Sequence, residues 1–382
     1  MNGYIDSHQH FWQLSRGDYD WLDNSPERIR KDFLPDHLRP ILTDAEVIGT
    51  VLVQAAPTEA ETSFLLELAE RTEFVAGVVG WMPLDAEDAA DKIDRLAENP
   101  WFKGVRPMIQ DIADDEWMLK PELDAPLKRL IRHGLCFDAL VKPWHLPNLL
   151  RLLKRYPKLR SVVNHGAKPD IASGAFDDWS RDIAAIANET GAFCKLSGLL
   201  TEAGFAAGIS ELKPYVEHLL ECFGPERLMW GSDWPVLLLA GDYRGWLSMV
   251  KEFTSRLGEP DKSSIMGGNC AKFYRLESRR TDRRLLRLHP QDNILVCCQS
   301  LAKAERISVE GVRVELPTTV ETGHKIASSA ISKGEKVIKY GVPIGTARVD
   351  ILLGDHVHLH NLKSDYVASH HRGGKRATGT RA

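Results

Sequence analysis

The chain has 382 residues, of which 43% are hydrophobic and 27% are charged, and its formal net charge is −4. This length allows two or three domains, or one barrel with an appended module, and the composition is typical of a globular protein. The mildly acidic charge gives no reason to expect nucleic acid as a partner, and no uninterrupted apolar run is long enough to span a membrane.

The N-terminus has no basic region followed by an apolar segment, so we expect no signal peptide. The six cysteines are scattered and include no Cys-x-x-Cys pair. We therefore expect reduced thiols in a cytoplasmic protein.

Short apolar runs alternate with longer amphipathic stretches from the N-terminus to about residue 276. Most of the apolar runs lack a clean polar alternation, as expected for parallel strands that are covered on both faces. Eight such βα units predict a (β/α)8 barrel over residues 1–276, and no Gly-x-Gly-x-x-Gly supports the rival doubly wound sheet. The expected strands are Tyr4–His8, Val47–Gln54, Val75–Trp81, Phe102–Pro107, Leu135–Val141, Arg160–His165, Ala192–Ser197 and Leu228–Ser232. The expected helices are Thr58–Thr72, Leu127–Arg132, Leu146–Tyr156, Trp179–Glu189, Leu212–Phe223, Trp246–Leu257 and, as the last, about Pro260–Leu276.

The composition changes at residues 277–284, a charged stretch that we expect to be a linker. Short β-like runs punctuated by glycine follow, and they predict a small β-rich domain over residues 285–363. The basic tail at 364–382 is expected to be disordered. The expected strands of this domain are Asn293–Cys297, Val312–Leu316, Lys336–Tyr340, Arg348–Leu353 and His356–His360, with one short helix around His324–Ser332.

Four potential metal ligands fall at the ends of expected barrel strands. His8 and His10 follow the first strand two residues apart, so both imidazoles can face one point. His165 ends the sixth strand and Asp233 follows the eighth. Active sites of these barrels lie at the carboxyl ends of the strands, and three imidazoles with one carboxylate suit Zn²⁺ or a similar divalent ion. The alternative is an incidental His-x-His and a helix-capping aspartate.

Five segments together resemble the amidohydrolase-related enzymes, and most closely their sugar-lactonase branch, which includes L-fuconolactone and L-rhamnonolactone hydrolases. They are Ile5–His10, Phe102–Arg106, Asn164–Gly166, Trp230–Pro235 and Gly267–Tyr274. The resemblance covers about residues 1–276.

The resemblance implies that His8, His10, His165 and Asp233 occupy the metal-site and acid/base positions of that branch, with Asp233 and His165 as catalytic residues. It implies at most one divalent metal, Zn²⁺ being the expected ion, and the metal could be dispensable. Asp233 would take a proton from water and later pass it to the leaving ring oxygen. Without metal, cationic groups would have to stabilise the oxyanion.

Other residues near strand ends are candidates for substrate binding. Lys103 and Arg106, at the fourth strand, could bind a polyhydroxylated lactone or its oxyanion, although a surface ion pair is an equally good interpretation. Trp81 and Trp234 could stack on a sugar, as could Trp12, although a large aromatic residue more often belongs to the core.

The C-terminal domain carries its own histidine pattern. His356, His358 and His360 would share one face of a strand and could bind a metal or an anion, unless they are simply surface histidines. Gly323–Ala327, Lys339–Gly341, Pro343–Gly345 and His356–Asn361 together resemble the small subunit, or N-terminal domain, of altronate and galactarate dehydratases, a β-clip-like SAF fold. The resemblance implies that His324, Lys325 and the three histidines contribute to a composite site, and that a large dehydratase subunit is the partner.

These observations favour a hydrolase that opens a sugar lactone to its aldonate, the kind of acid that a dehydratase would use next. A decarboxylase or hydrolase acting on a ring-derived carboxylate is a second hypothesis, and a non-catalytic barrel that carries the dehydratase module is a third.

Overall fold

The computed structural model describes residues 3–205, 207–276, 281–282, 284–310 and 312–364. The chain divides into two compact units, Met1–Leu276 and Glu277–Ala382. Most of the expected linker and the basic tail beyond residue 364 lie outside the described residues. Thr281, Asp282 and Arg284, within the expected linker, already bond to Glu305, Glu310 or each other in the second unit.

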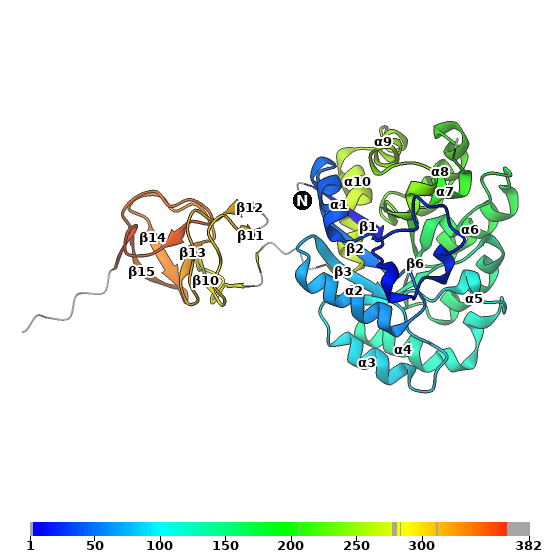
Figure 1. Ribbon diagram of the computed structural model, residues 1–382, viewed down its shortest axis with the longest axis horizontal. Helices are drawn as coiled ribbons and strands as arrows, with labels where there is room; N and C mark the ends of the chain where they lie inside the picture. The colour runs from blue at the N-terminus through cyan, green and yellow to red at the C-terminus, as the bar shows by residue number, and fades with distance from the viewer. Residues whose placement is uncertain (1–2, 206, 277–280, 283, 311, 365–382) are drawn as a thin grey trace, which may run out of the picture. The chain divides into compact units, whose positions relative to one another are not determined.

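The first unit is a barrel of eight parallel strands in the order of the sequence, surrounded by helices (Figure 1). A parallel bridge between Gln9 and Trp234 links the segment after the last strand to the first strand. The strands are β1 (Tyr4–Gln9), β2 (Val47–Val53), β3 (Val75–Gly80), β4 (Phe102–Val105), β5 (Cys136–Ala139), β6 (Arg160–Val163), β7 (Phe193–Leu196) and β8 (Leu228–Trp230). The (β/α)8 prediction is thus confirmed.

Helices follow the strands because their apolar residues recur at helical spacing and pack on the outside of the sheet. In α5, for example, Leu146, Leu149, Leu152 and Leu153 are buried. The helices are α1 (Pro35–Asp44), α2 (Glu59–Arg71), α3 (Ala89–Ala97), α4 (Asp124–His133), α5 (Leu146–Arg155), α6 (Asp177–Glu189), α7 (Leu199–Ala203), α8 (Ile209–Phe223), α9 (Tyr243–Phe253), α10 (Glu259–Ser263) and α11 (Asn269–Phe273).

The last barrel helix was expected to be continuous, and that prediction is wrong. A π-helical turn at Ser264–Gly268 separates α10 from α11. A Cβ on Gly267 would lie 2.9 Å from the backbone nitrogen of Ile5, so glycine lets the chain pass closely under β1. The Asn269 side chain then donates to the carbonyls of Pro225 and Leu228. The helix breaks because its middle must fit against the start of the barrel.

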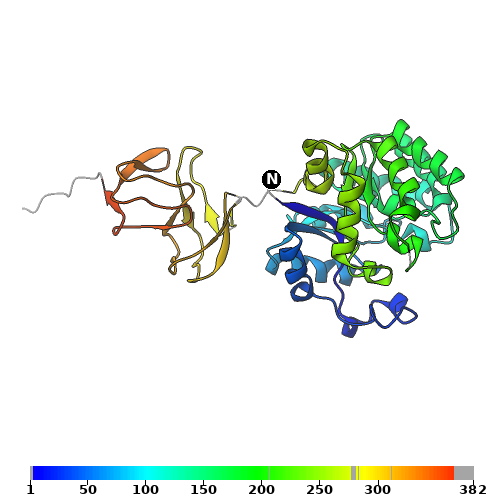
Figure 2. The same cartoon turned by 90° about the horizontal axis from the view of Figure 1, so that it is seen from above.

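The segment after β1 projects from one end of the barrel, as the blue segment in Figure 2 shows. It contains two short 3₁₀ turns, Leu14–Arg16 and Asp20–Leu22, before α1 begins. Buried Tyr19 donates a 2.6 Å hydrogen bond to Glu61 of α2, and Glu61 also accepts from the Ala55 nitrogen. This segment is therefore tied to the loop after β2.

The second unit is built from short antiparallel strands, as its glycine-punctuated sequence predicts. The sheets are ordered β16-β13-β10-β9, β11-β12 and β14-β15-β17. The strands are β9 (Leu285–Leu286), β10 (Ile294–Cys297), β11 (Arg306–Val309), β12 (Val312–Glu315), β13 (Lys325–Ala327), β14 (Lys336–Lys339), β15 (Val342–Ala347), β16 (His356–Val357) and β17 (Leu362–Ser364).

Three local predictions for this unit are wrong. The expected helix around His324–Ser332 is instead strand β13, which pairs with β10 and β16, followed by a turn to Ile331. The expected strand Arg348–Leu353 provides only an isolated bridge between Ile351 and Ile331. The expected strand His356–His360 ends at Val357, because Asn361 accepts a hydrogen bond from the His358 nitrogen and turns the chain.

Candidate active site

The carboxyl end of β1 is fixed by a buried aspartate. Asp6 accepts hydrogen bonds from the backbone nitrogens of His8 and Ser232, at 3.0 and 2.8 Å, and from the Tyr243 hydroxyl at 2.9 Å. One carboxylate thus joins the end of β1 to the loop after β8. Since His8 and Asp233 lie beside these two backbone contacts, Asp6 sets their relative position.

His8, His10, His165 and Asp233 meet at this end of the barrel. Oδ1 of Asp233 lies 3.1 Å from Nε2 of His10, 3.7 Å from Nε2 of His8 and 3.9 Å from Nε2 of His165. Nε2 of His8 lies 3.2 Å from Nε2 of His10. All four residues are almost fully buried. The three strand ends singled out from the sequence therefore deliver their side chains to one point.

Three of these atoms have the spacing of a metal cradle. Around a tetrahedral ion with ligand bonds of about 2.1 Å, neighbouring ligand atoms lie about 3.4 Å apart. The triangle formed by Nε2 of His8, Nε2 of His10 and Oδ1 of Asp233 has edges of 3.2, 3.1 and 3.7 Å. These residues are also the one group in the described part of the chain whose ligand atoms converge in this way. The donor set fits a divalent ion.

The protonation states of these groups suit metal binding and base catalysis. Burial lowers the pKa of His8, His10 and His165, in the last case to about 3, so all three imidazoles are neutral at neutral pH. Burial alone would raise the pKa of Asp233, but His165, the hydrogen bond with His10 and the charge of Lys168 outweigh it and lower that pKa to about 2. Asp233 is therefore an ionised acceptor.

His165 is presented by an unusual turn at residues Asn164–Ala167. His165, Gly166, Ala167 and Lys168 all have positive φ, between 50° and 64°. Such left-handed conformations are costly for residues with side chains and cluster at functional sites. Nδ1 of His165 lies 2.8 Å from the Ser197 hydroxyl, and a Cβ on Gly198 would collide with the imidazole at 2.6 Å. The turn and its neighbours fix the direction of Nε2 toward Asp233.

Two cationic side chains face His8 from opposite sides. Nη1 of Arg106 lies 3.4 Å from Nε2, and Nζ of Lys195 lies 3.1 Å from Nδ1. Fully buried Lys195 also donates to Asp138 at 2.7 Å, and Asp138 accepts from the Tyr274 hydroxyl at 2.8 Å. Sequence reasoning missed Lys195 and Tyr274. A lysine within the apolar run of the seventh strand was the available signal, because a buried charge needs a partner.

The structure sorts the predicted substrate-binding residues. Arg106 joins the site: besides its contact with His8, it donates to the Gln54 carbonyl. Trp81, at the end of β3, is partly buried and lines a pocket with Met108 and Trp117 in the loops after β3 and β4. Its stacking role stays a prediction.

Trp234, Trp12 and Lys103 lie elsewhere. Trp234 is 2% exposed and packs edge-on against aromatic rings of the core, Phe11 and Phe33, and Trp12 is likewise fully buried. Lys103 runs beside Gly77, in the middle of β3, and near Leu276. The structure thus places the Trp234 ring among core aromatic residues and the Lys103 side chain along β3, and their roles in substrate binding stay predictions.

The histidines of the second unit also gather, although not on one strand. Nδ1 of His324 lies 3.0 Å from Nε2 of His356, and the rings of His324, His356 and His358 are stacked with centroids 5.1 to 5.4 Å apart. His360 approaches His356 at 5.8 Å. Burial and the neighbouring histidines lower the pKa of His356 to about 4, and burial lowers the pKa of Lys325.

Comparison with known proteins covers both units. Residues 283–365 match the altronate/galactarate dehydratase SAF domain. Altronate dehydratase from Bacillus subtilis is 40% identical over 80 residues, which are 21% of this chain and 16% of that protein. No helix in the described part of the chain is long and apolar enough to cross a membrane.

The barrel has relatives along its whole length. An L-fucono-1,5-lactonase from Burkholderia ambifaria is 45% identical over 281 residues, covering 72% of this chain and 97% of the relative. An amidohydrolase from Burkholderia multivorans, whose crystal structure has bound zinc, is 35% identical in sequence. The match covers 72% of this chain and 100% of the chain in that structure, with a TM-score of 0.68. Residues 5–276 match the amidohydrolase family, and the chain belongs to it.

Proposed function

We propose that the barrel hydrolyses a sugar lactone of the fucono- or rhamnonolactone class to the corresponding aldonate. The observation that carries this proposal is the convergence of His8, His10, His165 and Asp233 beside the buried guanidinium of Arg106. Ester hydrolysis needs a base for water and a positive group for the developing oxyanion, and this site holds both. The similarity to an L-fucono-1,5-lactonase supplies the substrate class.

His8, His10 and Asp233, with His165 beside them, would hold one divalent ion, for which Zn²⁺ is our candidate. Such an ion, when bound, would polarise the carbonyl and lower the pKa of water. The chain's own groups do the rest. Asp233 accepts a proton from the attacking water, Arg106 donates hydrogen bonds to the carbonyl oxygen, and Asp233 returns the proton to the ring oxygen as the ester bond breaks. His165 orients the water through Nε2.

The test is a screen of 1,4- and 1,5-aldonolactones in weakly buffered solution with a pH indicator, with and without chelator. We expect acid release in step with lactone loss. Release of CO₂ from an aromatic carboxylate without any lactone opening would instead favour a decarboxylase. Loss of neither substrate, with the site residues intact, would leave the barrel as a scaffold and refute the proposal.

We also propose that the second unit acts as the small component of a sugar-acid dehydratase. His324, Lys325, His356, His358 and His360 would form its part of a composite site, because the four imidazoles cluster and Lys325 directly follows His324. The matched part is only 16% of altronate dehydratase, so the remaining machinery must come from a large subunit.

This second proposal is tested by assaying the release of a 2-keto-3-deoxy acid from aldonates, first with the chain alone and then after mixing with a large dehydratase subunit. We expect activity only in the mixture, with loss in a His356→Ala variant. Dehydration by the purified chain alone would refute the composite site.

A further inference from the structure

Three charged side chains that the catalytic proposal does not use meet near the mouth of the barrel. Nζ of Lys168 lies 3.6 Å from Oε1 of Glu202, and Nζ of Lys142 lies 3.9 Å from Oε2 of the same carboxylate. The exposed fraction of the side chain is only 20% for Lys168, 19% for Glu202 and 29% for Lys142. Two ammonium groups thus flank one carboxylate on both sides, with little solvent around them.

The three residues come from the segments that follow three adjacent strands, β5, β6 and β7. Lys142 follows β5. Lys168 completes the left-handed turn after β6, where its backbone nitrogen donates a hydrogen bond to the His165 carbonyl at 2.8 Å. Glu202 lies in α7, the helix after β7, and its carbonyl accepts from the Ala172 nitrogen at 3.2 Å. The carboxyl ends of barrel strands surround the active site, so this cluster belongs to its rim.

Lys168 links the cluster to the turn that presents His165, because its backbone nitrogen donates to the His165 carbonyl. The charges of Lys168 and Asp233 influence each other: Asp233 acts to raise the pKa of Lys168, although burial lowers it overall, and Lys168 helps to lower the pKa of Asp233. An exposed salt bridge contributes little to stability, and burial adds a desolvation cost. A purely structural role is therefore a poor explanation for placing it here.

Its chemistry matches a polyhydroxylated ligand. Each hydroxyl of a vicinal diol is both a hydrogen-bond donor and an acceptor. An ammonium group beside a carboxylate oxygen offers the complementary donor and acceptor at adjacent positions. The net charge of the three side chains is +1, because two lysines face one glutamate, and this also suits the carboxylate that lactone opening produces.

We propose that Lys168, Glu202 and Lys142 form a hydroxyl-binding subsite that makes the barrel select polyhydroxylated lactones over unsubstituted ones. This inference rests on the proposed lactonase function and adds its specificity determinant. A site built to hydrogen-bond substrate hydroxyls discriminates strongly against analogues that lack them, since its buried polar groups are then left unpaired.

The test compares kcat/KM for a 1,5-aldonolactone and for δ-valerolactone, which has the same ring without hydroxyls. In Glu202→Gln and Lys168→Met we expect kcat/KM for the aldonolactone to fall by about 10² or more, and that for δ-valerolactone to change less than about threefold. Equal losses on both lactones would show a general catalytic or structural role. Unchanged values for both would show that the cluster does not touch the substrate. Either result overturns the proposal.

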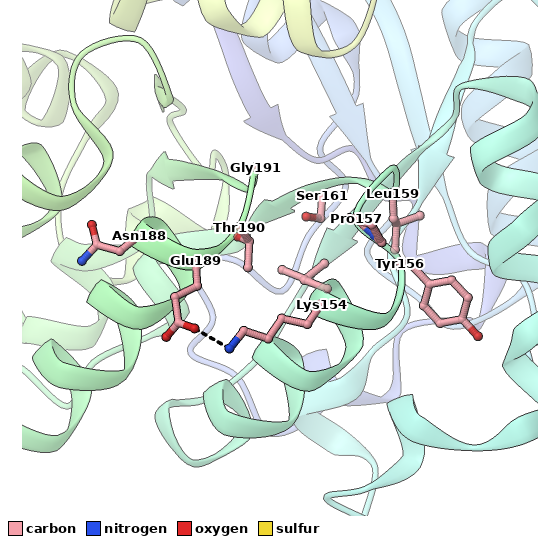
Figure 3. Close-up of a pocket in the computed structure, with 10 residues that line it drawn as sticks. Lys154, Tyr156, Pro157, Leu159, Ser161, Asn188, Glu189, Thr190 and Gly191 are labelled. Atoms are coloured by element: carbon pink, nitrogen blue, oxygen red, sulfur yellow. Dashed lines mark ion pairs between the residues drawn. The ribbon is translucent and has the colours of Figure 1, made fainter.

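Lys154→Met is the matched control. Lys154 at the end of α5 forms the same kind of pair with Glu189 at the end of α6, around a pocket shown in Figure 3. Helices of this barrel run opposite to the strands, so these helix ends lie at the far end from the mouth. This variant should leave both kcat/KM values unchanged.

A binding measurement separates this inference from the proposed function. The lactam analogue of the aldonolactone cannot be opened readily, and its Kd is measured by calorimetry. If the wild-type protein hydrolyses no lactone, the proposed function is refuted. A Kd for the lactam that is raised about tenfold or more in Glu202→Gln, and not in Lys154→Met, still supports the subsite. An equal Kd in wild type and Glu202→Gln overturns the subsite even if lactones are hydrolysed.

Discussion

Replacing Asp233 with asparagine tests the centre of the proposed chemistry. The substitution keeps the shape of the side chain and an oxygen for the contact with His10, but it removes the charge and the proton acceptor. The pKa of about 2 means that the carboxylate is fully ionised at neutral pH. Removing a general base costs typically 10²- to 10⁴-fold, or about 3–5 kcal/mol of barrier, so kcat for lactone opening should fall into that range.

The pH dependence follows from the direction of the shift. The pKa of Asp233 is depressed below its ordinary value of 3.8, so the ionised base persists as the pH falls and is lost only near pH 2. The rate of chelated wild type, followed by the pH indicator or by lactone absorbance, should therefore show no acid limb from this base above about pH 4.

The controls decide how the result is interpreted. Asp115→Asn changes an exposed carboxylate that pairs with His145 and should leave kcat unchanged. Thermal unfolding of Asp233→Asn should remain cooperative, and zinc content should be measured alongside the rate. Near-normal turnover in Asp233→Asn, or an acid limb near pH 6.5 that the variant leaves in place, would refute Asp233 as the base and point to an imidazole.

Four further outcomes follow from the structure. Because Arg106 and Lys195 both face His8, their positive charges oppose the binding of a dication, and a chelator should remove zinc from the site. Arg106→Gln should therefore lower the Kd for zinc, measured by calorimetry, while it slows lactone opening. A chain ending at Leu276 should fold and keep lactonase activity, since the barrel is a compact unit; aggregation would show a shared core. Burial lowers the pKa of His8 and His165 below the ordinary 6.5, so the unfolded chain takes up more protons on these groups below that pH. Their contribution to the stability of the chelated barrel should therefore be lost as the pH drops from 6.5 toward 3, which thermal unfolding across this range measures. Lys195→Met should destabilise the barrel by about 3–5 kcal/mol by leaving the buried Asp138 carboxylate without its cationic partner, which denaturant titration measures.

The barrel was predictable because its signal is local and repeated. Each strand is a short apolar run, each helix has a 3.6-residue period, and eight repeats leave few alternatives. His8, His10, His165 and Asp233 were predictable because strand ends converge in this fold whatever the details. The contacts that single side chains make inside the barrel were not predictable from the sequence. Lys195, Asp138 and Tyr274 form one buried network only after the ring closes, from three distant segments.

The differences between prediction and structure have two physical causes, side-chain direction in the barrel and tertiary pairing in the second unit. Lys103 and Arg106 are three residues apart at one strand, but β4 ends at Val105, so only Arg106 extends beyond the sheet while Lys103 runs back beside Gly77. In the second unit, Ile326, Ala327 and Ile331 have helix-like spacing, yet each is buried by pairing with a distant segment. Tertiary pairing overrides local propensity where elements are this short.

The joining of the two units has a chemical logic that rests on what lactone opening produces. The ring ester is uncharged, and its product is a carboxylate with hydroxyls on the neighbouring carbons, which is the kind of molecule that loses water to give a 2-keto-3-deoxy acid. If the second unit recruits a large dehydratase subunit, every barrel is tethered to the enzyme that uses its product. A tether converts encounter into an intramolecular event with an effective concentration set by its length, up to the millimolar range for short flexible connections. The gain in the rate of the combined reaction would be greatest where the product is scarce. It would vanish when the chain is cut between Leu276 and the second unit, while the two activities, measured separately, would remain.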